Sequence, residues 1–221
     1  MKPLIFPTEV NAEKLKRGCL LACIAHAIVV VQDPEFSYEH SWDGMSYSTI
    51  VGAQRGTVTF YQDGSCIAAF RNERSERLDN FVRAESYFQD APAPIYQMAN
   101  EEVLQYLLDD TEEGIKPLIT TAFWGKDEMF SNDSYEEMMD NGGDLLTYQV
   151  MDLEDACDGW EEFYDMTEEQ IELLKELYWQ RIEQLDVPMK LTKEQIKRMG
   201  KPSWGGKKES KESFAEIGIQ W

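Results

Sequence analysis

Short apolar segments separated by turn residues run from residue 47 to residue 70. The segments are YSTIV (47–51), GTVTFY (56–61) and SCIAAF (65–70), and the last two flank a Gln62-Asp63-Gly64 turn. Because β-branched and aromatic residues fit a pleated sheet and glycine allows the positive φ of a tight turn, this pattern predicts an antiparallel meander of about three strands. We expect Val58 and Phe60 to meet Ile67 and Ala69 across the last hairpin.

An uncharged run extends from residue 18 to residue 31 near the N-terminus. A membrane-spanning helix needs about 20 apolar residues, so this run is too short to cross a bilayer. We expect a buried helix from an N-cap at Thr8 to about Ala27, with Cys19, Cys23 and His26 on one face.

Two later apolar segments, KPLITTAFW (116–124) and LLTYQVM (145–151), predict further strands. Helices are predicted where a capping residue precedes an amphipathic segment. The predicted starts are Asn100 before EEVLQYLLDD, Ser134 with Glu137, Thr167 with Gln170, and Thr192 with Gln195.

The segment MDLEDACDGWEEFYD (151–165) carries seven carboxylates and no basic residue. Its apolar residues recur at spacings of three and four: Leu153, Ala156, Cys157, Trp160 and Tyr164. This spacing predicts a helix with one apolar stripe, whose remaining face carries the carboxylates.

Together these elements predict an α+β fold. We expect an antiparallel meander of about four or five strands, helices packed on one face of it, and a helical C-terminal third. The expected divisions are an N-terminal helix plus meander at 1–90, an acidic α/β continuation of the same domain with C-terminal helices at 91–200, and a basic tail at 201–221. The first boundary rests on Ala91-Pro92-Ala93-Pro94, a sequence that suits a rigid connector.

The net charge of −21 is concentrated in the middle of the chain. Residues 85–170 contain 24 carboxylates against two lysines, a net of −22, and the rest of the chain has a net of +1. A localised negative field indicates either a positively charged partner or a solvated face that keeps the protein soluble. Residues 190–211 carry eight bases against two acids, so this segment could also cover the acidic region.

The leading hypothesis is a non-enzymatic acidic binding or inhibitor protein that docks on a basic protein partner, such as a nuclease or another toxin. Its composition and size are similar to those of toxin immunity proteins and nucleic-acid mimics, in which carboxylates face a groove built for phosphate. The predicted partner-binding residues are Asp109, Asp110, Glu112, Glu113, Glu154, Asp155, Asp158, Glu161, Glu162 and Asp165.

Two alternatives remain open. One is a small hydrolase-type enzyme that uses His40 and Asp43, with a cysteine as a further candidate. The discriminating geometry is a histidine within hydrogen-bonding reach of a cysteine or a carboxylate inside a pocket. The other is an orphan bacterial domain whose acidic face is only solvated.

No phosphate-loop, dinucleotide-binding, α/β-hydrolase or zincin motif occurs in the sequence, and no cofactor or metal is predicted. Cys19, Cys23 and His26 have a spacing that could hold zinc, but core packing is the preferred interpretation. The four cysteines show no disulfide framework, which indicates a reducing compartment, and we expect a cytoplasmic protein. Direct binding to nucleic acid is not expected, because the acidic charge repels phosphate. A membrane is not expected as a partner either, because the uncharged run is too short to span one.

Overall fold

The computed structural model of the 221-residue chain describes residues 3–6, 9–79, 82–111, 114–184 and 187–221. It confirms the predicted α+β class, with the strands of the antiparallel sheet in the first two thirds of the chain and a helical C-terminal part. The chain forms two compact units. We call Met1–Leu15 with Gly44–Thr147 the sheet unit, and Lys16–Asp43 with Tyr148–Trp221 the helical unit.

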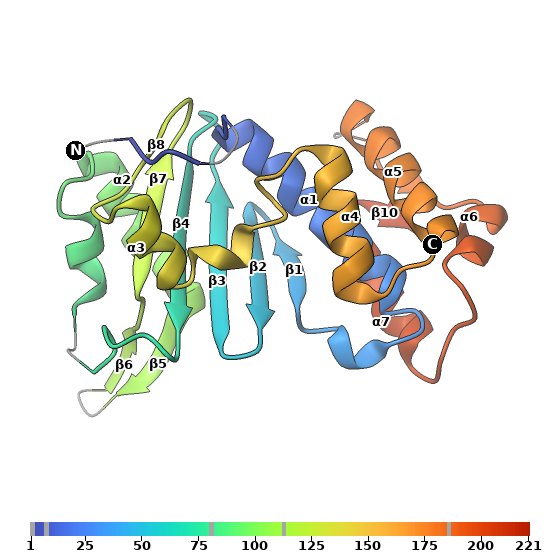
Figure 1. Ribbon diagram of the computed structural model, residues 1–221, viewed down its shortest axis with the longest axis horizontal. Coiled ribbons are helices and arrows are strands. Elements are labelled where there is room, and N and C mark those ends of the chain that lie inside the picture. Colours follow the sequence, from blue (N-terminus) through green and yellow to red (C-terminus); the bar gives the residue numbers. More distant parts are fainter. Residues whose placement is uncertain (1–2, 7–8, 80–81, 112–113, 185–186) are drawn as a thin grey trace. The chain divides into compact units, whose positions relative to one another are not determined.

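An antiparallel sheet forms the centre of the sheet unit (Figure 1). In the order in which they pair, its strands are β2 (Ser46–Val51), β3 (Gln54–Phe60), β4 (Cys66–Asn72), β7 (Thr121–Gly125) and β8 (Met129–Phe130). The meander predicted between residues 47 and 70 is therefore confirmed. The turn between β3 and β4 has the predicted chemistry, since Gly64 has a φ of 84° and Asp63 Oδ1 accepts a hydrogen bond from the Ser65 N–H at 2.9 Å.

The predicted register of the β3–β4 hairpin was wrong by one residue. Val58 pairs with Ala68, so Ile67 and Ala69 lie on the opposite face of the sheet. All seven residues of β4 are buried, so the alternation of apolar and polar residues that normally identifies the inner face is missing.

Helices cover the face of the sheet that carries Ile67 and Ala69. They are the 3-10 helices η2 (Ala84–Phe88) and η3 (Val103–Leu107) and the α-helix α2 (Ala93–Glu101). Ala91-Pro92-Ala93-Pro94, predicted as a connector, instead leads directly into α2, because proline is well accommodated in the first helical turn.

Two other predicted elements differ in the structure. EEVLQYLLDD, predicted as one helix, comprises the end of α2, then η3 and then most of β5 (Leu108–Thr111), which pairs with β6 (Gly114–Pro117). LLTYQVM, predicted as a strand, begins within the 3-10 helix η4 (Gly143–Leu146) and continues as turns. Its backbone makes local hydrogen bonds, such as that from the Thr147 N–H to the Asp144 carbonyl at 3.0 Å, so it forms no ladder.

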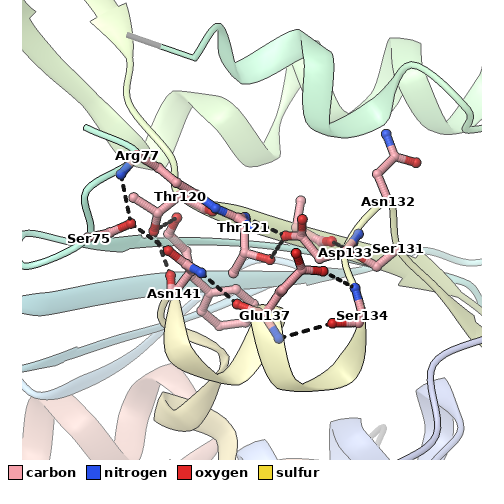
Figure 2. Close-up of polar contacts among 12 residues, drawn as sticks. Ser75, Arg77, Thr120, Thr121, Ser131, Asn132, Asp133, Ser134, Glu137 and Asn141 are labelled. Atoms are coloured by element: carbon pink, nitrogen blue, oxygen red, sulfur yellow. Dashed lines mark hydrogen bonds and ion pairs between the residues drawn. The ribbon is translucent and has the colours of Figure 1, made fainter. Parts of the chain in front are cut away.

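A polar network joins the segment after β4 to β7 and to the loop that follows β8 (Figure 2). Arg77 Nη1 donates to the Thr120 carbonyl at 2.8 Å and to Asp133 Oδ2 at 2.7 Å, and the Thr121 hydroxyl donates to the same carboxylate oxygen at 2.6 Å. The Arg77 guanidinium also lies 5.8 Å from the centre of the Tyr87 ring. Because these partners all belong to the sheet unit, the network stabilises that unit internally.

The helix α3 (Tyr135–Asp140) continues this network (Figure 2). Ser134 and Glu137 form the predicted capping box at its start, and this confirms the prediction. At its end, Asn141 accepts a hydrogen bond from the Ser75 hydroxyl at 2.5 Å through Oδ1 and one from the Thr120 hydroxyl at 2.6 Å through its carbonyl. These bonds attach the C-terminal end of the helix to the network, and its N-terminal end directly follows Asp133 of the network.

The helical unit contains most of the remaining elements. They are β1 (His40–Asp43), α4 (Leu153–Tyr164), α5 (Glu168–Glu183), β9 (Met189–Lys190), α6 (Lys193–Arg198), α7 (Gly206–Glu216) and β10 (Ile219–Gln220). The helix α1 (Ala12–Val29) begins in the sheet unit and continues into this one. The capping boxes predicted at Thr167 and Thr192 are confirmed.

The uncharged N-terminal run forms most of α1 and is buried, as predicted. Thr8, the predicted N-cap, lies outside the described residues, and Asn11 Oδ1 accepts a hydrogen bond from the Lys14 N–H at 2.8 Å at the helix start. Among the described residues, no helix combines the length and the apolar character that crossing a membrane requires.

Residues 201–221, expected as a basic tail, are folded into the helical unit. The Ser210 hydroxyl donates to the Ala27 carbonyl at 2.6 Å, and Phe214 and Ile219 are buried. The strand β10 pairs in parallel with β9. A Cβ atom at Gly206 would lie 2.2 Å from the Val31 carbonyl oxygen, so glycine allows α7 to approach the end of α1 closely.

Candidate partner-binding surface

The segment 151–165 forms the helix that its spacing predicts. It begins after Asp152, whose carbonyl accepts a hydrogen bond from the Ala156 N–H at 2.8 Å. It ends at Asp165, which has a left-handed φ of 51°. Four residues of the predicted apolar stripe are buried, namely Ala156, Cys157, Trp160 and Tyr164. The stripe fixes the orientation of the helix, so its other face is directed to solvent.

Six carboxylates occupy that other face, and we call them the α4 acidic face. They are Glu154, Asp155, Asp158, Glu161, Glu162 and Asp165, and all six are exposed. Glu154 forms an ion pair with Lys175 at 2.5 Å. Within the part of the chain that the structure describes, the other five form no ion pair. The exposed residues Glu168, Glu169 and Glu172 at the start of α5 extend the negative charge.

Aromatic side chains pack together on the buried side of α4. The Trp160 ring stacks on Tyr164 with a centroid distance of 5.7 Å and meets Tyr148 at 4.9 Å. Phe163 meets the edge of Tyr164 at 4.8 Å but is itself 39% exposed, so part of its apolar ring faces solvent on the same helix as the carboxylates. A partly exposed aromatic ring on a helix that also carries a charged face is a candidate interface anchor.

The other predicted partner-binding residues belong to the sheet unit. Asp110 on β5 is exposed, whereas Glu112 and Glu113 lie outside the described residues. Asp109 accepts a hydrogen bond from Arg55 Nη2 at 3.1 Å and also forms an ion pair with Arg71. Since Arg55 and Arg71 are directly opposed on β3 and β4, the Asp109 carboxylate offsets their mutual repulsion. The charge of Asp109 is therefore engaged within the chain.

His40 and Asp43, the residues predicted for the enzymatic alternative, do not form a common site. His40 is 3% exposed and packs edge-on against His26 at 5.5 Å and Trp160 at 5.4 Å. Asp43, three residues further along β1, is exposed. Because successive side chains of a strand point to opposite faces, His40 and Asp43 do not converge on one site.

The two histidines are held in their neutral form. Burial lowers the pKa of His26 to about 4, although the hydrogen bond between its Nε2 and the Phe36 carbonyl, 2.9 Å long, acts in the opposite direction. Burial and the neighbouring His26 lower the pKa of His40 well below its ordinary value. Close by, Glu39 accepts a hydrogen bond from the Tyr164 hydroxyl at 2.8 Å, and burial raises the pKa of Glu39. Sequence spacing gave no signal for this pair.

All four cysteines are buried free thiols. Burial raises the pKa of the Cys23 and Cys66 thiols, which disfavours the reactive thiolate. In the described part of the chain, no three His, Cys, Asp or Glu side chains are arranged to hold a metal ion.

The basic segment 190–211 makes its ion pairs elsewhere. Arg198 pairs with Glu176 on α5, and Lys208 pairs with Glu209 and Glu212 within α7. The Lys207 and Lys211 ammonium groups each lie 5.8 Å from the centre of the Trp221 ring. None of these interactions neutralises a carboxylate of the α4 acidic face.

Comparison with protein-family models, curated proteins and solved structures found no match to this chain.

Proposed function

We propose that this chain is a non-enzymatic binding or inhibitor protein whose α4 acidic face docks on a basic protein partner, such as a nuclease or another toxin. The proposal rests on one observation: α4 and its C-cap carry five exposed carboxylates that form no ion pair among the described residues, and a partly exposed phenylalanine lies on the same helix. An acidic surface of this kind is complementary to a groove that binds phosphate, as in immunity proteins and nucleic-acid mimics.

Electrostatic attraction would make the association of this face with a basic partner fast and would orient the two proteins. Residues 152–172 carry ten carboxylates and no basic side chain. A field of this sign raises the association rate with a basic groove by a factor of roughly 10 to 1,000 at low salt. Burial of Phe163 on docking would then slow dissociation, because hot spots of interfaces are enriched in desolvated aromatic residues.

This proposal assigns the main role to α4 rather than to β5. Asp109 already offsets two arginines, so it has less charge to offer a partner than the carboxylates of α4 have. The proposal also includes a cytoplasmic location, which the four free cysteines support, because thiols stay reduced there. Direct nucleic-acid binding is not proposed, since the acidic surface repels phosphate.

The experiment must distinguish this proposal from the alternative that the acidic face only keeps the protein solvated. In the experiment, the full chain captures proteins from a lysate of its native host at about 50 mM and at about 500 mM NaCl, concentrations between which the screening length falls severalfold. The test variant neutralises the α4 acidic face with isosteric amides: Asp155→Asn, Asp158→Asn, Glu161→Gln, Glu162→Gln and Asp165→Asn. The control variant removes the same charge from exposed positions of the sheet unit: Glu85→Gln, Asp90→Asn, Asp127→Asn, Glu128→Gln and Glu136→Gln.

We expect the wild type and the control variant to retain one basic protein at low salt and the test variant to lose it. High salt should release it from all three. If the test variant captures the same proteins as the wild type, or if no basic protein is retained at low salt, the acidic face only solvates the protein.

A further inference from the structure

A pocket of about 660 Å³ opens at the C-terminal end of α4, within the helical unit. Its lining includes Asp33, Phe36, Phe163, Tyr164, Asp165 and Lys201. Three of these residues belong to α4 or follow it directly, so the pocket borders the α4 acidic face. The lining combines carboxylates with aromatic rings, and both attract cations.

Two helix ends add to the negative potential of this pocket. The helix α4 ends at Tyr164, with Asp165 as its C-cap, and α1 ends at Val29, four residues before Asp33. A helix C-terminus carries a partial negative charge of about half an elementary charge, which favours a cation. The Asp33 N–H donates to the Val29 carbonyl at 3.1 Å, which places Asp33 directly at the end of α1.

The charged form of Asp33 is not fully compensated within the chain. Desolvation and the neighbouring Glu35 raise the pKa of the Asp33 carboxyl group. A bound cation would remove part of this cost, because an opposite charge favours the ionised carboxylate.

Three aromatic rings line the pocket. The centroids of Phe36 and Tyr164 lie 5.8 Å apart at an interplanar angle of 54°, and Phe163 meets Tyr164 edge-on at 4.8 Å. Rings at such angles expose faces on which a flat cation can stack. A guanidinium group suits this arrangement better than an ammonium group, because it is planar, weakly hydrated and able to bind a carboxylate with two hydrogen bonds.

We propose that this pocket receives an arginine side chain of the basic partner, with Asp33 and Asp165 holding the guanidinium group and Phe163 stacking on it. The inference rests on the proposed function and names the group of the partner that the acidic surface recognises. Lys201 lies in the same pocket and is exposed. Its ammonium group competes with the incoming guanidinium, so it lowers affinity.

The test uses N-acetyl-arginine amide, whose only charge is the guanidinium group, and N-acetyl-norleucine amide as the uncharged control. Each is titrated into the full chain and followed by the NMR shifts of amides around the pocket. We expect saturable binding of the arginine probe with a dissociation constant of roughly 1–10 mM, as befits one isolated side chain. The norleucine probe should produce no comparable shifts.

Single substitutions then locate the site. Asp165→Asn should weaken binding roughly fivefold and Phe163→Leu roughly threefold, whereas Lys201→Gln should strengthen it. Asn tolerates the left-handed backbone of position 165, so the first substitution should leave the fold intact. The matched control is Asp155→Asn, which removes one charge from α4 outside the pocket lining and should change affinity by less than about twofold.

Equal binding of the two probes would contradict the arginine site. So would NMR shifts from the arginine probe that Asp165→Asn and Phe163→Leu leave unchanged. This outcome is separate from failure of the proposed function. If the five-amide variant loses the partner while Phe163→Leu and Asp33→Asn retain it at full affinity, the acidic face binds the partner and the arginine pocket is wrong.

Discussion

Replacing Trp160 by alanine should lower the free energy of unfolding by about 3–5 kcal/mol, the usual loss for removing a buried tryptophan. The indole is 2% exposed and contacts Tyr148, Tyr164, Phe163 and His40. Its removal would leave a cavity between α4 and the residues beneath it. Urea unfolding, followed by circular dichroism, measures the loss.

Phe163→Ala is the matched control, because Phe163 belongs to the same aromatic cluster but is 39% exposed. It should cost less than Trp160→Ala, about 1–2 kcal/mol, because more than a third of the Phe163 side chain already faces solvent in the folded state. An equal loss for the two substitutions would mean that Phe163 is a core residue, and it would contradict its assignment as an interface anchor.

Acidification from pH 6.5 to pH 4 should destabilise the helical unit through His26. The imidazole has an ordinary pKa of 6.5, which the unfolded chain retains, and burial lowers it to about 4 in the folded state. Between these values the unfolded state binds the proton and the folded state does not, so stability falls as the pH falls. The expected slope is about 1.4 kcal/mol per pH unit, or about 3 kcal/mol over the interval. The stabilisation is fully present above pH 6.5, and no further loss arises from His26 below pH 4.

Other groups of the helical unit also contribute. His40, whose pKa is lowered well below its ordinary value, acts in the same direction as His26, whereas two carboxyl groups act in the opposite direction. Burial raises the pKa of Glu39 and of Glu216, so protonation of these carboxyl groups favours the folded state as the pH falls. The slope must therefore be compared with that of His26→Gln, which should lack the His26 contribution. NMR titration provides a second measurement, because the chain contains only two histidines. A His26 resonance that titrates near pH 6.5 in the folded protein, or equal slopes for the two proteins, would contradict a buried neutral imidazole.

Helix starts, turns and buried helix faces could be predicted from the sequence where a short residue pattern is compatible with only one local structure. Three capping boxes, the Asp63-Gly64 turn and the apolar stripe of α4 each follow from spacing alone. The register of β4 could not be predicted in this way, because both of its faces are buried and either alternation satisfies the pattern. Pro92 and Pro94 do not by themselves distinguish a connector from a helix start, since proline suits a connector and a first helical turn equally well.

The candidate site could be predicted only in part. The carboxylates of α4 follow from its amphipathic spacing, because the stripe that is buried determines the face that is exposed. The pocket could not be predicted, since Asp33 and Phe36 are more than one hundred residues before Phe163 in sequence and no local pattern connects them. For the same reason, the engagement of Asp109 by Arg55 and Arg71 depends on strand pairing rather than on composition.

The most direct test of the acidic docking surface is the rate of association with the captured basic partner as a function of ionic strength. Stopped-flow fluorescence of the wild type should show a rate that falls at least about tenfold between about 50 mM and about 500 mM NaCl. The five-amide variant should associate more slowly at low salt and depend less on salt, while the sheet-unit control should follow the wild type. A wild-type rate that is independent of salt, or that the amides on α4 leave unchanged, would contradict the proposal that this face guides the partner.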